Sequence, residues 1–143
     1  RLDTALTRGT GSALTVAMID VDRFKLINDN SGHLAGDTVL REIAVRIGRH
    51  IRAQDAVGRL GGDEFAILID ASDDIDVHDI CNRIVAAISN TPIALPNGGA
   101  LHTAISCGVG RHQPGQSADD LLHAADSALY AAKRAGRNRV VAA

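Results

Sequence analysis

The chain has no apolar run near the ~20 residues that a membrane-spanning helix needs, and no signal-peptide pattern. Its two cysteines are too few for a disulfide framework. Basic residues are not in excess, since Lys and Arg total 15 against 17 Asp and Glu. The lack of a basic excess argues against a nucleic-acid-binding surface that extends over the whole domain. We therefore expect a cytoplasmic domain that contacts neither nucleic acid nor membrane, although the parent protein could be tethered to a membrane elsewhere.

Several common catalytic motifs are also missing. The six histidines show neither HxxxH nor HExxH spacing, which weighs against a zinc site, and there is no GxxxxGK[ST] phosphate loop. A hydrophobic content of 45% over 143 residues instead indicates one compact domain with a real core. The first nine residues read like the tail of a helix. We expect residues 1–143 to be one domain, excised from a longer multidomain protein.

The first half of the chain alternates between strand and helix patterns. Residues 14–22 form an apolar strand that ends in two carboxylates, and residues 24–32 predict a short helix. Residues 35–52 carry a one-sided apolar stripe that is typical of a helix. Two apolar strands then flank the glycine pair of GGDE at 61–64, which predicts a hairpin inside a sheet.

The second half repeats this alternation. It predicts a helix from Val77 to Ile88, a hairpin that turns at PNGG and continues from Leu101 to Val109, a last helix and an edge strand at 140–141. The last helix is expected to begin at Ser117 and to end at Gly136. Mixed order with hairpins indicates an α+β fold with a ferredoxin-like, antiparallel-dominated sheet flanked by helices.

Acidic residues lie at two strand ends. Asp20 and Asp22 share one face of the first strand, and burying two like charges is costly unless a cation compensates. Magnesium is the natural candidate because it takes carboxylate and phosphate oxygens. Asp63 and Glu64 would join this site if their hairpin lies beside the first strand. The alternatives are a strand that ends at a polar loop and an ordinary solvated turn.

Basic residues complete a possible phosphate site. Lys25 stands at the start of a helix, where backbone amides attract anions. Lys133 and Arg137 are four residues apart at the end of the last helix, although such placement is also common for helix stability alone. Metal and cations together would suit a triphosphate. Asn28 and Asp37 could read a base that has both donors and acceptors, such as guanine.

Four motifs in this order carry a family resemblance. They are DVDRFKLIND at 20–29, GHLAGD at 32–37, RLGGDEF at 59–65 and AKRAGRN at 132–138. In this order and spacing they resemble the GGDEF family of diguanylate cyclases, over nearly the whole chain. The resemblance implies the core shared by nucleotidyl cyclases and polymerase palms, and the condensation of two GTP into cyclic di-GMP with release of two pyrophosphates.

The resemblance also implies roles for single residues. Asp20, the Val21 carbonyl and Asp63 would hold two Mg²⁺ ions, which Mn²⁺ could replace. Asp63 and Glu64 would be catalytic, with Asp63 helping to activate the attacking 3′-hydroxyl. The family works as a homodimer under the control of regulatory domains. The residues implied in substrate binding are Phe24, Lys25, Asn28, His33, Asp37, Lys133 and Arg137.

The RxxD pattern at 52–55 matches the family's inhibitory product site. Arg52 and Asp55 would bind cyclic di-GMP, with Arg83 on the next helix as a further partner, and the alternative is a solvated helix end. Two other functions stay open. One is a catalytically silent module that binds GTP or cyclic di-GMP, and the other is a cyclase with a single-nucleotide product.

Overall fold

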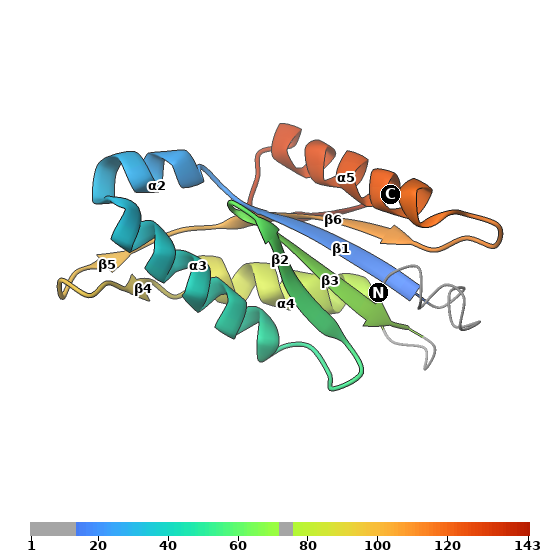
Figure 1. Cartoon of the computed structure of the whole chain (residues 1–143), viewed down its shortest axis with the longest axis horizontal. Helices are drawn as coiled ribbons and strands as arrows, with labels where there is room; N and C mark the ends of the chain where they lie inside the picture. The colour runs from blue at the N-terminus through green and yellow to red at the C-terminus, as the bar shows by residue number, and fades with distance from the viewer. Residues whose placement is uncertain (1–13, 72–75) are drawn as a thin grey trace.

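The computed structural model describes residues 14–71 and 76–143. A five-stranded sheet with strand order β2-β3-β1-β6-β7 forms the centre, and helices cover both of its faces (Figure 1). The predicted helix tail at the start of the chain lies outside the described residues. The α+β class is confirmed, because β1 runs antiparallel to both of its neighbours and, among the described strands of this sheet, only β6 and β7 are parallel.

The described elements follow the predicted order. The helices are α2 (Phe24–Ser31), α3 (His33–Gly48), α4 (Val77–Ser89) and α5 (Ala118–Arg134). The strands are β1 (Leu14–Val21), β2 (Ala56–Gly61), β3 (Glu64–Asp70), β4 (Ile93–Ala94), β5 (Ala100–Leu101), β6 (Ile105–Arg111) and β7 (Val140–Ala142). Among the described helices, none combines the length and the hydropathy that a membrane span needs.

Strand β1 lies at the centre of two hydrophobic layers, and all eight of its residues are buried. Ala17, Ile19 and Val21 face the larger core under α3 and α4. Leu14, Val16 and Met18 face the opposite way and pack against α5. This burial on both faces explains why the strand reads as a continuous apolar run and not as an alternating one.

Helix α5 lies directly on the sheet because β6 carries glycine at the contact. A Cβ atom on Gly108 would stand 2.1 Å from the backbone nitrogen of Leu129, so any side chain there would push the helix away. The Ser117 hydroxyl caps the helix by accepting a hydrogen bond of 3.1 Å from the Asp120 N–H, as predicted. The close packing brings the C-terminal end of α5 over the carboxyl end of β1.

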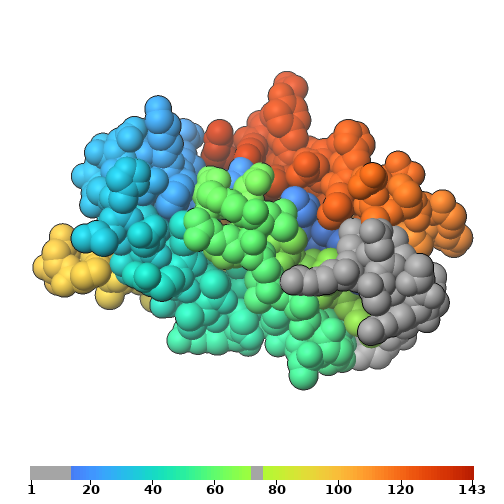
Figure 2. Space-filling model, in the orientation of Figure 1, coloured from blue at the N-terminus to red at the C-terminus, as the bar shows by residue number. Residues whose placement is uncertain are grey.

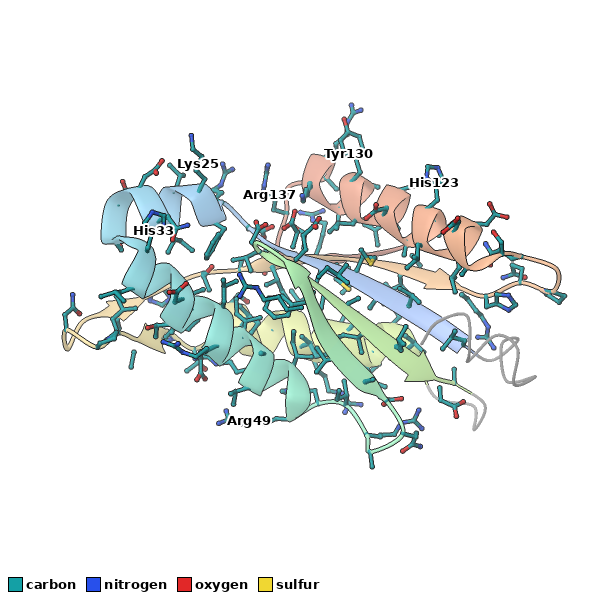
Figure 3. The ribbon with its side chains drawn as sticks, viewed as in Figure 1. Lys25, His33, Arg49, His123, Tyr130 and Arg137 are labelled. Carbon is teal, nitrogen blue, oxygen red and sulfur yellow. The ribbon has the colours of Figure 1, made fainter. Side chains whose placement is uncertain are left out.

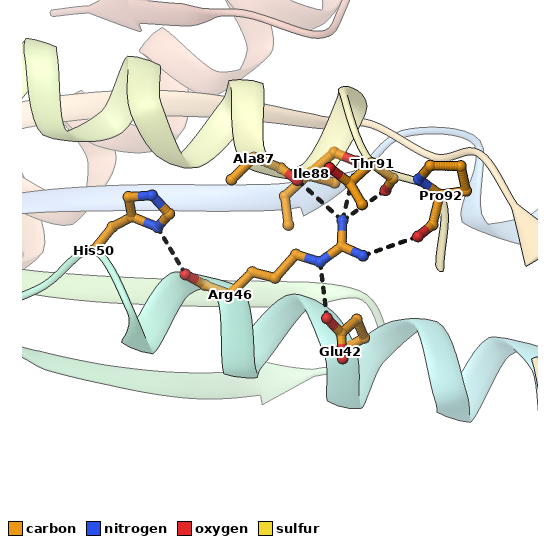
Figure 4. A network of polar contacts seen from close by, with 7 residues as sticks. All are labelled: Glu42, Arg46, His50, Ala87, Ile88, Thr91 and Pro92. Carbon is orange, nitrogen blue, oxygen red and sulfur yellow. Dashed lines mark hydrogen bonds and ion pairs between the residues drawn. The ribbon is translucent and has the colours of Figure 1, made fainter. Parts of the chain in front are cut away.

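A buried arginine joins α3 to the end of α4 (Figure 4). Arg46 is 7% exposed and binds Glu42 at 2.8 Å through its Nε atom. The rest of its guanidinium donates to the carbonyl oxygens of Ala87, Ile88, Thr91 and Pro92. These include carbonyls of the last turn of α4, which have no partner inside the helix. Arg46 therefore caps α4 from outside.

Two strand predictions are wrong. The single strand expected from Leu101 to Val109 is split, because residues 100–101 pair with β4 and only residues from 105 onward join the main sheet. Strand β1 ends at Val21, and its pairing with the β6 side of the chain stops one bond later, where the Asp22 N–H donates to the Ala104 carbonyl at 2.9 Å. The hairpin at Gly61 forms as expected, but its first strand, β2, is an exposed edge and not an interior strand.

Candidate functional site

The carboxyl end of β1 and the turn between β2 and β3 lie side by side. Asp20 is paired with Glu64 in the β1–β3 register, and the Val21 N–H donates to the Asp63 carbonyl at 3.1 Å. The predicted adjacency of the two acidic segments is therefore confirmed. Figure 2 shows the β2–β3 hairpin at the surface, in this view between the α2–α3 segment and α5.

The acidic side chains are not fully satisfied within the described protein. Asp20 is 8% exposed, and one of its oxygens accepts a hydrogen bond from the Lys133 ammonium. Its other oxygen, Oδ1, is buried and has no hydrogen-bond partner among residues 14–71 and 76–143. Burial, and then the neighbouring Asp20 carboxylate, raise the pKa of Asp63 above its ordinary value. A cation between the two carboxylates would relieve both effects.

The donor set fits a hard metal ion. Two carboxylates and the Val21 carbonyl offer the oxygen ligands that Mg²⁺ prefers, and the unpartnered Asp20 oxygen is the observation that supports the fit. Within residues 14–71 and 76–143, no three His, Cys, Asp or Glu side chains form a metal-binding group. An ion here would complete its shell with water or ligand oxygens, as Mg²⁺ does when it binds phosphates.

The second carboxylate of the DxD motif has a different environment. Asp22 reaches Ser106, the cross-strand neighbour of Asp20, so both carboxylates lie on one face as predicted. Both oxygens of Asp22 already have partners, because it accepts from the Ser106 hydroxyl at 2.6 Å and from the Asn138 N–H at 2.9 Å. Of the two, only Asp20 keeps an oxygen without a partner.

Three cations, from α2, from α5 and from the segment that follows α5, lie around this end of the sheet. Lys133 from α5 is bound to Asp20. Lys25 is exposed in the first turn of α2, whose N-terminus has no side-chain cap. In Figure 3, Lys25 and Arg137 stand on the same side of the molecule, where the start of α2 faces the end of α5. The arrangement suits a polyanion that extends away from the carboxylates.

The predicted base-reading residues lie at the junction of α2 and α3. Asn28 packs against Gly36, where an added Cβ would stand 2.0 Å from the Asn28 Oδ1 atom, which is buried and has no partner. Asp37 is exposed on the rim of a hollow of about 200 Å³. Leu40, Val57 and Phe65 give this hollow apolar walls. An apolar slot with a carboxylate at its rim can hold a flat base that has N–H donors.

The remaining predicted site residues are more scattered. Phe24 begins α2 and packs partly into the core, with its ring beside Gly36. Glu64 is exposed and lines a shallow hollow of about 410 Å³ with Lys133 along α5. His33 is exposed at the start of α3, and Figure 3 places it at the far end of α2 from Arg137. The predicted role of His33 in substrate binding stays a prediction.

The RxxD segment lies away from the acidic site and is internally paired. The Asp55 side chain is fully buried and accepts from the Arg52 backbone N–H at 2.9 Å, the Arg52 Nε at 3.1 Å and the Asp70 N–H at 3.1 Å. The Arg52 side chain keeps 25% of its surface exposed and also donates to the Asp70 carbonyl. Arg83 is 65% exposed and pairs with Asp79 on α4.

Two carboxylates at the end of the central strand and the adjacent turn, flanked by lysines and an arginine, define a candidate site for a metal ion and a phosphorylated ligand. Comparison with known proteins identifies the family. The sequence pattern described as "Diguanylate cyclase, GGDEF domain" matches residues 1–139. The chain therefore belongs to the GGDEF family of diguanylate cyclase domains, as the four motifs indicated.

Named relatives support this assignment. The chain is 44% identical over 126 residues to the diguanylate cyclase TpbB of Pseudomonas aeruginosa, covering 87% of the chain and 29% of TpbB. It is 38% identical over 131 residues to the diguanylate cyclase DosC of Escherichia coli, covering 92% of the chain and 28% of DosC. The chain thus spans less than a third of the length of these relatives.

Solved structures agree on the fold. The GGDEF domain of TpbB superposes with a TM-score of 0.92 at 41% identity, covering all of this chain and 91% of that one. The GGDEF domain of DgcB from Caulobacter crescentus, solved in complex with cyclic di-GMP, gives 0.91 at 34% identity, covering 99% and 85%.

Proposed function

We propose that this domain is a diguanylate cyclase that condenses two GTP into cyclic di-GMP. Each 3′-hydroxyl oxygen attacks the α-phosphorus of the other nucleotide, the bond to the β-phosphate breaks, and pyrophosphate leaves twice. The observation that carries the proposal is the buried, unpartnered oxygen of Asp20 beside Asp63, at the meeting point of the family's motifs. Such a site needs a cation, and the surrounding basic residues need an anion.

Asp20, Asp63 and the Val21 carbonyl would hold the two Mg²⁺ ions, or Mn²⁺ in their place. When bound, the metal lowers the pKa of the attacking hydroxyl and neutralises charge on the phosphoryl group. Glu64, next to Asp63 in the turn, adds negative charge at the mouth of the site. In this arrangement Asp63 both orients the metal and favours loss of the hydroxyl proton.

The triphosphate would extend from the carboxylates toward the basic residues. Lys133 is now paired with Asp20, so an arriving cation would free its ammonium for a phosphate oxygen. Arg137 can bind phosphate with two parallel N–H donors. Lys25 and the backbone amides of Phe24 and its neighbours add donors at the start of α2.

Guanine would occupy the hollow between α3 and β2. The Asp37 carboxylate can accept both the N1–H and the exocyclic amino group of guanine. The Asn28 amide can donate to the ring acceptors, and Leu40 and Val57 cover the faces of the base. Adenine has no matching pair of donors, so the hollow favours GTP over ATP.

Turnover would need two copies of the domain. One site holds one GTP, so two sites must face each other before both bonds can form. The rate per domain should therefore rise with protein concentration and with fusion to a dimerising partner. In the whole protein, regulatory domains would control this pairing.

Product inhibition would act through the RxxD segment. The Asp55 carboxylate fixes Arg52, whose partly exposed guanidinium can bind a phosphate or guanine edge of cyclic di-GMP. Arg83 on α4 would add a second, exposed cation. DgcB, whose fold this chain shares, was solved with cyclic di-GMP, which supports a product-binding surface on this scaffold.

The test is incubation of the purified domain, at high concentration or fused to a dimeriser, with GTP and Mg²⁺. Products are separated by chromatography and identified by mass spectrometry. The proposal requires cyclic di-GMP, and it requires that Asp63→Asn abolish it. A product made from a single nucleotide would replace the proposal with a different cyclase. GTP binding without any product would indicate a silent binding module.

A further inference from the structure

We propose that Asp22 is a positioning residue that holds the Arg137 segment in place for phosphate binding. The inference rests on the proposed function, since it takes Arg137 as a phosphate ligand. Asp22 joins two segments far apart in the sequence, through the Ser106 hydroxyl on β6 and the Asn138 N–H beyond α5. Neither contact involves a reacting group, so any effect on catalysis has to pass through the residues that Asp22 holds.

The segment that follows α5 has an unusual backbone. Gly136, Arg137 and Asn138 have φ values of 125°, 65° and 50°, and non-glycine residues rarely adopt such angles. Backbone hydrogen bonds to carbonyls of the last turn of α5 continue as far as the Arg137 N–H, which donates to the Ala132 carbonyl at 3.0 Å. The next N–H, that of Asn138, goes to Asp22. Asp22 thus accepts the first backbone N–H that the helix itself does not bind, and this N–H belongs to a residue with a positive φ angle.

The carboxylate that receives this N–H is itself fixed. Ser106 has no exposed surface and donates to the Asp22 Oδ1 atom at 2.6 Å. Ser106 is also the cross-strand neighbour of Asp20. The two carboxylates of the DxD motif therefore bind both ends of the segment 133–138. Asp20 binds the side chain of Lys133, and Asp22 accepts a hydrogen bond from the backbone of Asn138. Arg137, which lies between them, is held in a fixed relation to the acidic site.

The same contacts separate this role from that of a metal ligand. Both Asp22 oxygens already accept hydrogen bonds from the protein, whereas Asp20 keeps a buried oxygen with no partner. An asparagine at position 22 could preserve both contacts, because its carbonyl can accept from the Asn138 N–H while its amide donates to the Ser106 oxygen. Alanine would lose both. If Asp22 were a metal ligand, either substitution would weaken metal binding.

The experiment compares Asp22→Ala and Asp22→Asn, each alone and combined with Arg137→Ala. GTP affinity is measured by calorimetry in Mg²⁺, and kcat, KM and the Mg²⁺ concentration for half-maximal rate are measured with the dimerised domain. We expect Asp22→Ala to weaken GTP binding about tenfold, mainly through KM, and Asp22→Asn to regain most of this. In the Arg137→Ala background, Asp22→Ala should cause no further loss. The Mg²⁺ requirement should not change.

Controls keep these outcomes distinct. Asp119→Ala removes an exposed carboxylate at the far end of α5 and should leave affinity unchanged. If Asp22→Ala fails to fold, Ser106→Ala loosens the same contact and should weaken GTP binding about threefold. Losses that add in the double variant, or an Asp22→Asn variant as weak as Asp22→Ala with a raised Mg²⁺ requirement, would overturn the proposal. Absence of cyclic di-GMP from the wild type would instead refute the proposed function, because the binding cycle does not depend on turnover.

Discussion

Two buried charged groups in this domain have opposite environments. The Arg46 guanidinium binds Glu42 and four carbonyl oxygens, so α3 and α4 together satisfy it (Figure 4). Among the described residues, the Asp20 carboxylate has one lysine on one oxygen, no hydrogen-bond partner on the other, and a second carboxylate beside it. Both are buried charges that cost free energy unless compensated. The protein satisfies the arginine by itself, and in the proposed function a metal ion completes the environment of the carboxylate.

This difference separates a structural role from a functional one. Removing a satisfied charge should cost stability and leave the chemistry intact. Removing an unsatisfied charge should cost chemistry and leave the fold intact, or even more stable.

The largest effect is expected for Asp63→Asn. The substitution keeps the size of the side chain and removes the charge that, in the proposed function, orients the metal and favours loss of the hydroxyl proton. Cyclic di-GMP synthesis should fall roughly a thousandfold or more. Initial rates measured by chromatography on the dimerised domain check this. Activity within tenfold of wild type would mean that the acidic pair is not the reaction centre.

Arg46→Ala tests the satisfied side of the comparison. It leaves the carbonyl oxygens at the end of α4 and the Glu42 carboxylate without their donor, and should lower the free energy of unfolding by about 3 kcal/mol. Urea unfolding measures the loss, with Arg49→Ala as a matched control. Arg49 is exposed at the end of the same helix and extends outward in Figure 3, so its substitution should change stability by less than about 0.5 kcal/mol. Equal losses in the two variants would contradict the assigned role of Arg46.

Asp37→Asn extends the comparison to an exposed carboxylate with a proposed partner. In the proposed function the Asp37 carboxylate accepts hydrogen bonds from two guanine donors, whereas an asparagine would accept one and place its own amide donor against the other. KM for GTP should rise about tenfold, and the preference for GTP over ITP, which lacks the exocyclic amino group, should shrink. Kinetics with both nucleotides decide this. An unchanged preference would remove Asp37 from base recognition.

Arg52→Ala probes a charge that is satisfied yet partly exposed. Asp55 keeps two backbone N–H donors after the change, so the domain should stay folded. Inhibition by added cyclic di-GMP should weaken about tenfold while the uninhibited rate stays the same. Dose–response curves for Arg52→Ala and Arg83→Ala, compared with wild type, test the two residues separately. Unchanged inhibition in Arg52→Ala would leave that arginine a purely structural role.

The sequence predicted the elements that depend on local pattern. The apolar run of β1, the stripe of α4 and the Ser117 cap all lie where expected. Sheet position was harder, because β2 has apolar residues but only one neighbouring strand. The break before Ile105 follows from the length of β1, a non-local property that no pattern in residues 101–109 reveals.

The site was predictable as a set of residues but not as a set of contacts. The motifs located Asp20, Asp63 and Lys133, and the structure brings them together. Ser106 carried no signal, because a serine inside an apolar strand has many uses. The separate environments of Asp20 and Asp22 could not be read from DxD spacing, because they depend on a backbone N–H located 116 residues further along the chain.

The most direct test of the comparison is thermal unfolding of wild type and Asp63→Asn, each alone and with GTP and Mg²⁺. The pKa of Asp63 is raised in the folded domain, so its ionised form at neutral pH opposes folding. We predict that ligand-free Asp63→Asn melts at the same temperature as wild type or higher, and that GTP with Mg²⁺ raises the midpoint of wild type far more than that of the variant. A variant that melts lower without ligand, together with a wild type that GTP and Mg²⁺ do not stabilise, would contradict the account.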